Sequence, residues 1–476
     1  AGYIPDNVDV VLRFTDEKTL TEMLGITPNE VLNLILENRL VLEGNLSYLQ
    51  LFNFYVALLL NRKHQKMLDR IRADDISSSK LKYQVNNHCL AQELLNRKKS
   101  RLRAQGVDPG VEYLKDPYLS AYALEDFPRL KDFLDIHFNT RPEICAERPA
   151  LLTRWYRENG FELDSCGTPW APQLRQALAF RYLMENKRPI IRRNDLIAGT
   201  TTAKAIGVVI YPDAQGTMIW GELDSVEKRI LNPYGISGED RRILHHEVFP
   251  FWAERNFREV ARKEYNNPLG EKIDERFVAY FVWKSVAVSH TIPDFPSVLE
   301  KGIEGITEEI VKRRERACDI DEKNTLDAMI ITLEGVGAYA KNLAEEAKRL
   351  AEKEKDPARK KELVRLEQIC RKVPAHPCET LDEAVNAVWV MWVALHMENT
   401  NTGLSLGRLD QWLQPYFLND ISKLLTDAQR QEYIEKAIEL VGCLLMRCTD
   451  HLPLVPDIGN YLFGGSSSDQ AITLGG

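Results

Sequence analysis

The sequence of 476 residues contains only eight cysteines, and these are scattered rather than paired. No Cys-x-x-Cys pair and no His-rich zinc spacing occurs among them, so a structural zinc site is not indicated. Thiols without a pairing pattern favour the reduced state, which predicts a cytoplasmic location. We therefore expect neither a disulfide framework nor a bound metal.

Long apolar runs are also missing. The longest one, Ala384 to Met397, is interrupted by Asn386 and His396 and is shorter than the roughly 18 residues that a membrane span needs. The chain does not start with a basic segment followed by an apolar one, so a secretion signal is not indicated. We expect no membrane partner, and we interpret the apolar run as a buried helix.

Positive charge is not in excess, because 62 Lys and Arg residues stand against 70 Asp and Glu residues, which gives a formal net charge of -8. A chain without surplus cations cannot neutralise many phosphates, so nucleic acid is not an expected partner. Hydrophobic residues make up 44% and charged residues 28%, as in ordinary folded chains. The length corresponds to about three domains, or to fewer if one large α/β barrel is present.

Local patterns predict an α/β fold in which long helices alternate with short buried strands. Capping residues mark the starts of several helices, and β-branched runs mark candidate strands. The predicted helix starts are Asp356-Pro357, Thr380 with Glu383, and Thr426 with Gln429, and the candidate strands are 205–211 and 472–474.

Two regions of the chain differ in pattern. Residues 1–140 are polar, and we interpret them as a mostly helical N-terminal extension, whereas residues 141–476 form the main domain. The chain begins with Ala1 rather than Met and stops at Gly476, directly after turn and strand residues. We expect it to be a fragment of a longer protein.

Several common catalytic motifs are absent from the sequence. The Gly- and Ser-rich run 464–468 has neither the second flanking Gly of a hydrolase elbow nor the Lys of a phosphate-binding loop. The adjacent residues His245, His246 and Glu247 do not share a helix face, so they cannot hold one metal ion without further ligands. The sequence therefore gives no support to a hydrolase triad or to a P-loop.

His290 and Asp294 are candidate substrate contacts, because a His and a carboxylate four residues apart follow an apolar run. At the mouth of a cavity such a pair could orient a hydroxyl group or move a proton. The alternative is a loop in which Asp294 caps the next helix. The sequence leaves both interpretations open.

Three further residues are candidate substrate contacts. Tyr211 and Gln215 follow a predicted buried strand, where α/β proteins bind their ligands, although turn formation explains the neighbouring Pro212 and Gly216 equally well. Ser405 lies in a loop of small polar residues that follows the buried helix 384–397. That loop could line a cavity or simply turn the chain.

Taken in order, several segments resemble the glycyl radical enzymes of the pyruvate formate-lyase-like family. The resemblance covers residues 141–476, with Pro149 where the family usually has Ala. The segments are 141–153 (E-I-x-x-E-R-A-x-L-x-T in the family), 193–199 (D-E-L-I-x-G), 247–252 (E-x-F-P-Y-W), 289–302 (G-H-x-x-x-D followed by V-L-x-x-G), 405–416 (S-L-G-R-F-D-Q and P-Y) and 463–476 (a Gly-rich strand).

The resemblance implies the first half of a ten-stranded α/β barrel surrounded by helices. It also implies a lyase that cleaves a C–C or C–heteroatom bond of a small-molecule substrate, of which formate C-acetyltransferase is a representative. In this family a protein-derived glycyl radical generates a thiyl radical, which abstracts hydrogen from the substrate. The implied partners are a radical S-adenosylmethionine activating enzyme and a second copy of the chain in a homodimer, and no separate cofactor is bound.

The sequence departs from the family at the radical positions. The thiyl Cys belongs to a Gly-Cys-x-Glu loop, but Cys443 is followed by two leucines, and the R-V-x-G motif of the radical Gly does not occur. The resemblance therefore implies no catalytic residue in this chain, and we assign no such role to Cys443 or Cys448. Both motifs are expected downstream of Gly476.

The substrate is open at this stage. Polyol dehydratases of the family have a hydroxyl residue where Gly403 stands, which disfavours diol dehydration. The alternatives are fumarate addition of the alkyl- or benzylsuccinate synthase type, arylacetate decarboxylation, and a non-catalytic half-barrel scaffold.

Overall fold

The computed structural model describes residues 8, 10–23, 31, 34–35, 37–45, 48–49, 51–52, 122–217, 219–229, 231–264, 267–275, 291–400, 403–454, 456–457 and 471–472. The chain divides into two compact units, Phe54–Thr140 and the combination of Ala1–Asn53 with Arg141–Gly476. The described part of the first unit consists of the turn η1 (Leu124–Asp126) and α6 (Pro128–Asn139), which buries Leu130 and Phe133.

An antiparallel pair of strands lies near the N-terminus. It joins β1 (Val10–Phe14) to β2 (Leu40–Gly44), and α1 (Glu17–Met23) follows β1. The sequence does not predict these two strands, and the mostly helical structure expected for residues 1–140 stays a prediction, because most of these residues lie outside the described part. Each strand has only five residues, and the partner lies far along the chain, so the local pattern does not reveal the pairing. Its core consists of Met23, Val31, Leu34, Ile35, Leu40, Leu42 and Leu49.

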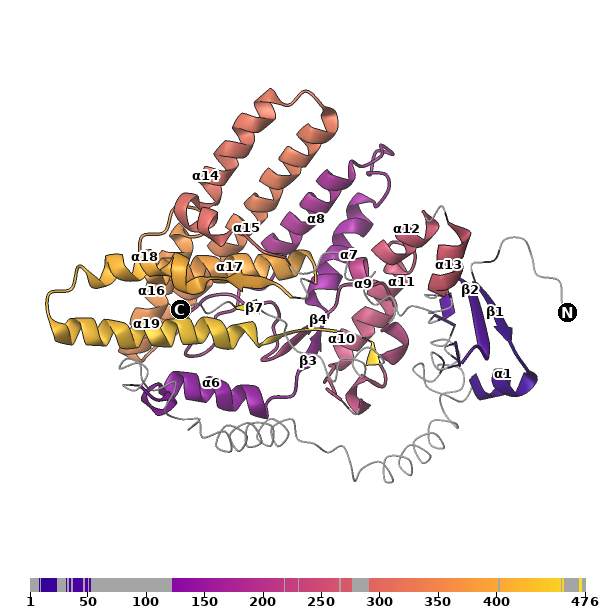
Figure 1. Cartoon of the computed structure of the whole chain (residues 1–476), viewed down its shortest axis with the longest axis horizontal. Helices are drawn as coiled ribbons and strands as arrows, with labels where there is room; N and C mark the ends of the chain where they lie inside the picture. Colours follow the sequence, from indigo (N-terminus) through magenta and orange to yellow (C-terminus); the bar gives the residue numbers. More distant parts are fainter. Residues whose placement is uncertain are drawn as a thin grey trace, which may run out of the picture. The chain divides into compact units, whose positions relative to one another are not determined.

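A parallel sheet lies at the centre of the larger unit (Figure 1). It has the order β3 (Glu143–Cys145), β4 (Gly207–Val209) and β6 (His451–Pro453). All residues of β4 are buried, as expected for a parallel strand covered on both faces. A second parallel pair joins β5 (Ser405–Gly407) to β7 (Ala471–Ile472). The strand predicted within 205–211 is confirmed, and the one predicted at 472–474 is confirmed for Ile472.

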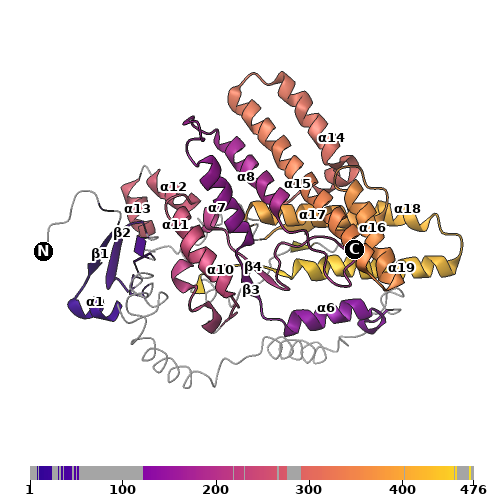
Figure 2. The ribbon, with the colours of Figure 1, turned by 180° about the vertical axis from the view of Figure 1, so that it is seen from behind.

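Helices make up most of the described structure. Figures 1 and 2 show a row of neighbouring helices formed by α7, α8, α15 and α14, and α16 also packs on α15. From Arg141 on, the helices of the described residues are α7 (Glu147–Asn159), α8 (Pro172–Asn186), α9 (Pro212–Gln215), η2 (Trp220–Glu222), η3 (Val226–Lys228), α10 (Gly238–Ile243), the π-helix η4 (Leu244–Val248), α11 (Phe249–Trp252), α12 (Phe257–Lys263), α13 (Pro268–Glu275), α14 (Phe295–Arg316), α15 (Ile320–Lys353), α16 (Pro357–Lys372), α17 (Leu381–Glu398), α18 (Leu409–Ile421) and α19 (Asp427–Cys448).

The predicted helix starts are confirmed. The Asp356 carboxylate accepts hydrogen bonds from two amides of α16, and Thr426 and Gln429 form a reciprocal capping box at α19. At α17 the Thr380 hydroxyl accepts the amide of Glu383 at 3.2 Å. The Glu383 carboxylate instead accepts the amide of Glu379 at 2.7 Å, so only half of the predicted box forms there.

Helix α17 is the buried helix that the sequence predicts at 384–397, and α8, α14, α15, α16, α18 and α19 all pack on it. Among the helices in the described part of the chain, none combines the length and the apolarity needed to cross a membrane. Short parallel strands with long helices around them make this an α/β fold.

Replacement of Gly207 by Ala tests the packing of the central strand. A Cβ at this position would overlap the Thr202 side chain, so we expect Gly207→Ala to lower the free energy of unfolding by about 1–3 kcal/mol. Chemical denaturation measures the loss. Gly238→Ala is the matched control, because no atom lies within 4 Å of its added Cβ. Equal stability of the two variants would contradict this packing.

Candidate active site

The first part of the candidate site lies where β3 and β4 end. In a parallel sheet the carboxyl ends of the strands meet at one edge, which is where α/β proteins place ligands. Arg148 stands in the first turn of α7, directly after β3, and Tyr211 and Asp213 stand where β4 leads into α9. Pro212 occupies the first position of α9, where its fixed backbone angle favours the start of a helix.

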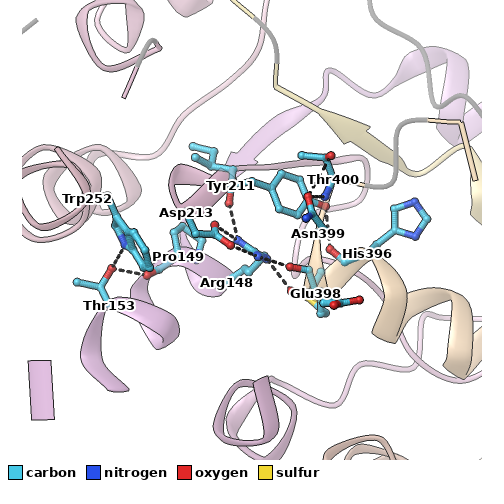
Figure 3. A network of polar contacts seen from close by, with 12 residues as sticks. Arg148, Pro149, Thr153, Tyr211, Asp213, Trp252, His396, Glu398, Asn399 and Thr400 are labelled. Atoms are coloured by element: carbon cyan, nitrogen blue, oxygen red, sulfur yellow. Dashed lines mark hydrogen bonds and ion pairs between the residues drawn. The ribbon is translucent and has the colours of Figure 1, made fainter. Parts of the chain in front are cut away.

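Arg148 is 3% exposed, and all of its N–H donors have acceptors (Figure 3). Its two Nη atoms donate to the Asp213 carboxylate at 2.8 and 2.9 Å. The remaining donors reach the backbone carbonyls of Met397 at 2.7 Å, Glu398 at 2.8 Å and Ile210 at 3.4 Å. The Asp213 carboxylate raises the pKa of the Arg148 guanidinium despite its burial, so this group is a permanent cation.

Tyr211 is fully buried under Arg148. The guanidinium carbon lies 4.4 Å from the centre of the phenol ring, a cation–π contact. The Tyr211 hydroxyl donates to the carbonyl of His396 at 2.8 Å. Burial raises the pKa of this phenol, so it stays protonated and able to donate. Tyr211, one of the predicted substrate contacts, thus uses its hydroxyl to bind the end of α17.

A second part of the site joins the loop before α14 to β5. The amide of Ser405 donates to the carbonyl of Thr291 at 2.9 Å, which brings Ser405 next to the residue that follows His290. The Asp294 carboxylate is exposed and caps α14, accepting the amide of Ser297 at 3.2 Å and its hydroxyl at 2.5 Å. These bonds lower the pKa of Asp294. Asp294 therefore caps the helix that follows it, which is the second of the two interpretations that the sequence leaves open.

Two predicted contacts cannot be placed in this way. His290 lies outside the described residues, and Gln215 is the last residue of α9, but the described structure does not include its side chain. The structure thus brings Ser405 next to Thr291, three residues before Asp294. It places Tyr211 at the opposite end of the connection from α17 to β5, where its hydroxyl binds the carbonyl of His396.

A stack of buried rings inside α17 was not predicted from the sequence. Trp389 and Trp392 stack with their centres 4.7 Å apart, and the His396 ring lies 3.9 Å from Trp392. The spacing of these residues could have indicated the stack, since residues three and four positions apart share a helix face. Nδ1 of His396 donates to the carbonyl of Trp392 at 2.9 Å, and burial lowers the pKa of His396 to about 4.

His451, the first residue of β6, lies 4.4 Å from the His396 ring, measured between ring centres. Both of its ring nitrogens are buried and have no hydrogen-bond partner in the described structure, and burial lowers its pKa. Both imidazoles in this core are therefore neutral at pH 7.

Metal ligands and thiol nucleophiles find no support in the part of the chain that the structure describes. No group of three or more His, Cys, Asp or Glu side chains there could hold a metal ion. Cys443 and Cys448 are buried, and burial raises the pKa of Cys448, which disfavours its thiolate. His245 instead accepts a hydrogen bond from Trp220 Nε1 at 3.0 Å.

The family model described as "Pyruvate formate lyase-like" matches residues 126–476, which include every part of this site. The chain belongs to the pyruvate formate lyase-like family.

Relatives of this family member are glycyl radical enzymes. The isethionate sulfite-lyase of Nitratidesulfovibrio vulgaris is 28% identical over 365 residues, which cover 73% of this chain and 42% of the relative. The trans-4-hydroxy-L-proline dehydratase of Clostridioides difficile is 29% identical over 341 residues, covering 70% and 41%. A glycyl radical enzyme structure from Archaeoglobus fulgidus superposes with a TM-score of 0.64 at 28% identity, covering 73% and 43%. The chain thus spans about two fifths of the length of these relatives.

The buried His396 predicts a loss of stability in acid. Its pKa is about 4 in the folded state against 6.5 for the free side chain, so protons bind preferentially to the unfolded chain as the pH falls below 6.5. We expect the free energy of unfolding to fall by about 3 kcal/mol between pH 6.5 and 4 because of this residue.

Urea denaturation across this pH range measures the effect, and His396→Gln should flatten the slope. His376→Gln is the matched control, because the His376 side chain is half exposed. An unchanged slope in His396→Gln would show that His396 titrates normally in the folded protein.

Proposed function

We propose that this chain is the N-terminal part of a glycyl radical lyase that removes a group bound through oxygen or sulfur from a small polar substrate. The names of two relatives support this reaction class, since one is a sulfite-lyase and the other is a dehydratase. Because the chain spans 42% and 41% of these relatives, the activity belongs to the proposed whole protein. We also propose that this chain forms the first half of a ten-stranded α/β barrel.

The observation that carries the proposal is the contact between Ser405 at the start of β5 and Thr291 in the loop before α14. The amide of Ser405 lies 2.9 Å from the carbonyl of Thr291, although the two residues lie far apart in the sequence. Ser405 is partly exposed, so its hydroxyl can reach a ligand beside this contact. The contact therefore places Ser405 next to the residue that follows His290 in the sequence.

We assign the following roles to this chain. The Ser405 hydroxyl hydrogen-bonds a substrate hydroxyl, and His290 accepts the proton that this hydroxyl loses when the neighbouring group leaves. Asp294 fixes the loop of His290 through its cap on α14. Tyr211 and Gln215 lie at the other end of the connecting segment. Tyr211 is fully buried with its hydroxyl on the carbonyl of His396, and we propose that both residues act by shaping this end of the site.

Hydrogen transfer is assigned to no residue of this chain. The radical of the family would supply removal of a hydrogen atom from the substrate and its return to the product. Cys443 and Cys448 do not fit the role of the thiol, since both are buried and lack the Gly-Cys-x-Glu context. A radical S-adenosylmethionine activating enzyme and a homodimeric state are part of the proposal.

The test is product analysis with the full-length protein, activated anaerobically by its radical S-adenosylmethionine enzyme. Isethionate, hydroxyproline, a 1,2-diol, an arylacetate and a hydrocarbon with fumarate are supplied in parallel. We expect release of sulfite or water with formation of the unsaturated or carbonyl product. Release of carbon dioxide from the arylacetate, or a succinate adduct, would replace this proposal by decarboxylation or fumarate addition. Absence of an activatable radical would favour the non-catalytic scaffold.

Ser405→Ala tests the proposed substrate contact. Loss of one hydrogen bond to the substrate should lower kcat/KM about tenfold without changing the radical content measured by electron paramagnetic resonance. Ser422→Ala is the matched control, because Ser422 is exposed at the end of α18 and its hydroxyl only donates to the carbonyl of Asn419. Equal activity of both variants would remove Ser405 from the site.

A further inference from the structure

Side chains from outside α17 bind the carbonyls at its carboxyl end. The last four carbonyls of a helix have no partner within it and need other donors. Arg148 donates to the carbonyls of Met397 and Glu398, and Tyr211 donates to that of His396. A cation at this end also interacts favourably with the helix dipole. Residues after two different strands thus cap the last turn of α17.

A direct role of Arg148 in substrate binding conflicts with its contacts. An arginine has five N–H donors, and each donor of Arg148 already has an acceptor within the protein. The Asp213 carboxylate neutralises its charge through two parallel bonds. No donor is left for a substrate carboxylate or sulfonate, so the residue acts on the protein and not on the ligand.

The segment after α17 leads directly to Ser405. The amide of Asn399 donates to the carbonyl of Leu395 at 3.2 Å, and the amide of Thr400 donates to the Asn399 side chain at 2.6 Å. Thr400 and Leu404 are buried, and Ser405 is held by the carbonyl of Thr291. The segment is therefore fixed at one end by the cap on α17 and at the other by the loop before α14.

We propose that Arg148 is a positioning residue, which together with Asp213 and Tyr211 fixes the carboxyl end of α17 and thereby places Ser405 for its substrate. The substrate contact of Ser405 rests on the proposed function, whereas the fixing of residues 399–400 and 403–405 does not. Arg148 sets where this segment starts, because it binds the carbonyl of Glu398, the last residue of α17 before the segment.

Hydrogen–deuterium exchange of the full-length protein tests the proposal. Arg148→Lys keeps the charge but has three donors instead of five. We expect exchange at the amides of Asn399 and Ser405 to become about tenfold faster, as for the loss of a charge-assisted hydrogen bond. Tyr211→Phe removes one donor and is the milder variant in case Arg148→Lys does not fold; its expected increase is about threefold.

The matched control is Arg447→Lys. Arg447 is a buried arginine of α19 that pairs with Asp195 and with Asp450. Exchange at residues 399–405 should stay at the wild-type rate in this variant. In activated protein, kcat/KM should fall about tenfold in Arg148→Lys while the radical content stays constant, and it should not fall in Arg447→Lys.

The outcomes separate this proposal from the proposed function. Faster exchange at the amides of Asn399 and Ser405 in Arg148→Lys, but not in Arg447→Lys, supports the positioning role, even if the wild-type protein releases neither sulfite nor water. Wild-type exchange at these amides in folded Arg148→Lys overturns it, even if the lyase activity is found. If Arg148→Lys does not fold, the same two outcomes are read from Tyr211→Phe. A global rise in exchange that Arg447→Lys shares would also overturn it, because the effect would then not be local.

Discussion

The structure around the candidate site depends on one constraint: a buried guanidinium must be paired. Arg148 satisfies it with the Asp213 carboxylate and with carbonyls from two separate segments. Removal of one partner from such a pair leaves an uncompensated charge and typically costs about 3–5 kcal/mol. The turn after β3, the turn after β4 and the end of α17 are therefore held in one arrangement, because separating any of them exposes unpaired donors or acceptors.

This constraint explains how a helix in the core can serve a site at its end. Helix α17 is buried over most of its length, and Trp389, Trp392 and His396 fill its surroundings with stacked rings. Its start is fixed by the Thr380 cap and its end by Arg148 and Tyr211. The helix is thus a rigid support, and its fixed end sets the position of the short segment that follows it.

The sequence predicts local features of this fold well. The caps of α16, α17 and α19 follow from residues within one turn of each helix start, and the buried α17 follows from its composition. The strands are harder, because β1 and β2 pair across about 30 residues and no local pattern marks their register. The ordered motifs of residues 141–476 predicted the family, which the match to residues 126–476 shows.

The candidate site could be predicted only in part. Ser405 and the loop of Asp294 were identified in the sequence, but their contact arises from the fold. The pair of Arg148 and Asp213 was missed because 65 residues separate its members, and neither stands in a pattern that marks a salt bridge. Sequence motifs indicated that the segment around Arg148 matters, whereas only the structure shows that its guanidinium holds the end of α17.

A double-mutant cycle between Arg148 and Asp213 tests the central constraint most directly. The free energy of unfolding is measured by chemical denaturation for the wild-type protein, Arg148→Met, Asp213→Ala and the double variant. If the buried charge pair holds the site together, the double variant loses less stability than the sum of the single variants, with a coupling energy of about 2 kcal/mol. Additive losses, with a coupling energy near zero, would contradict the account.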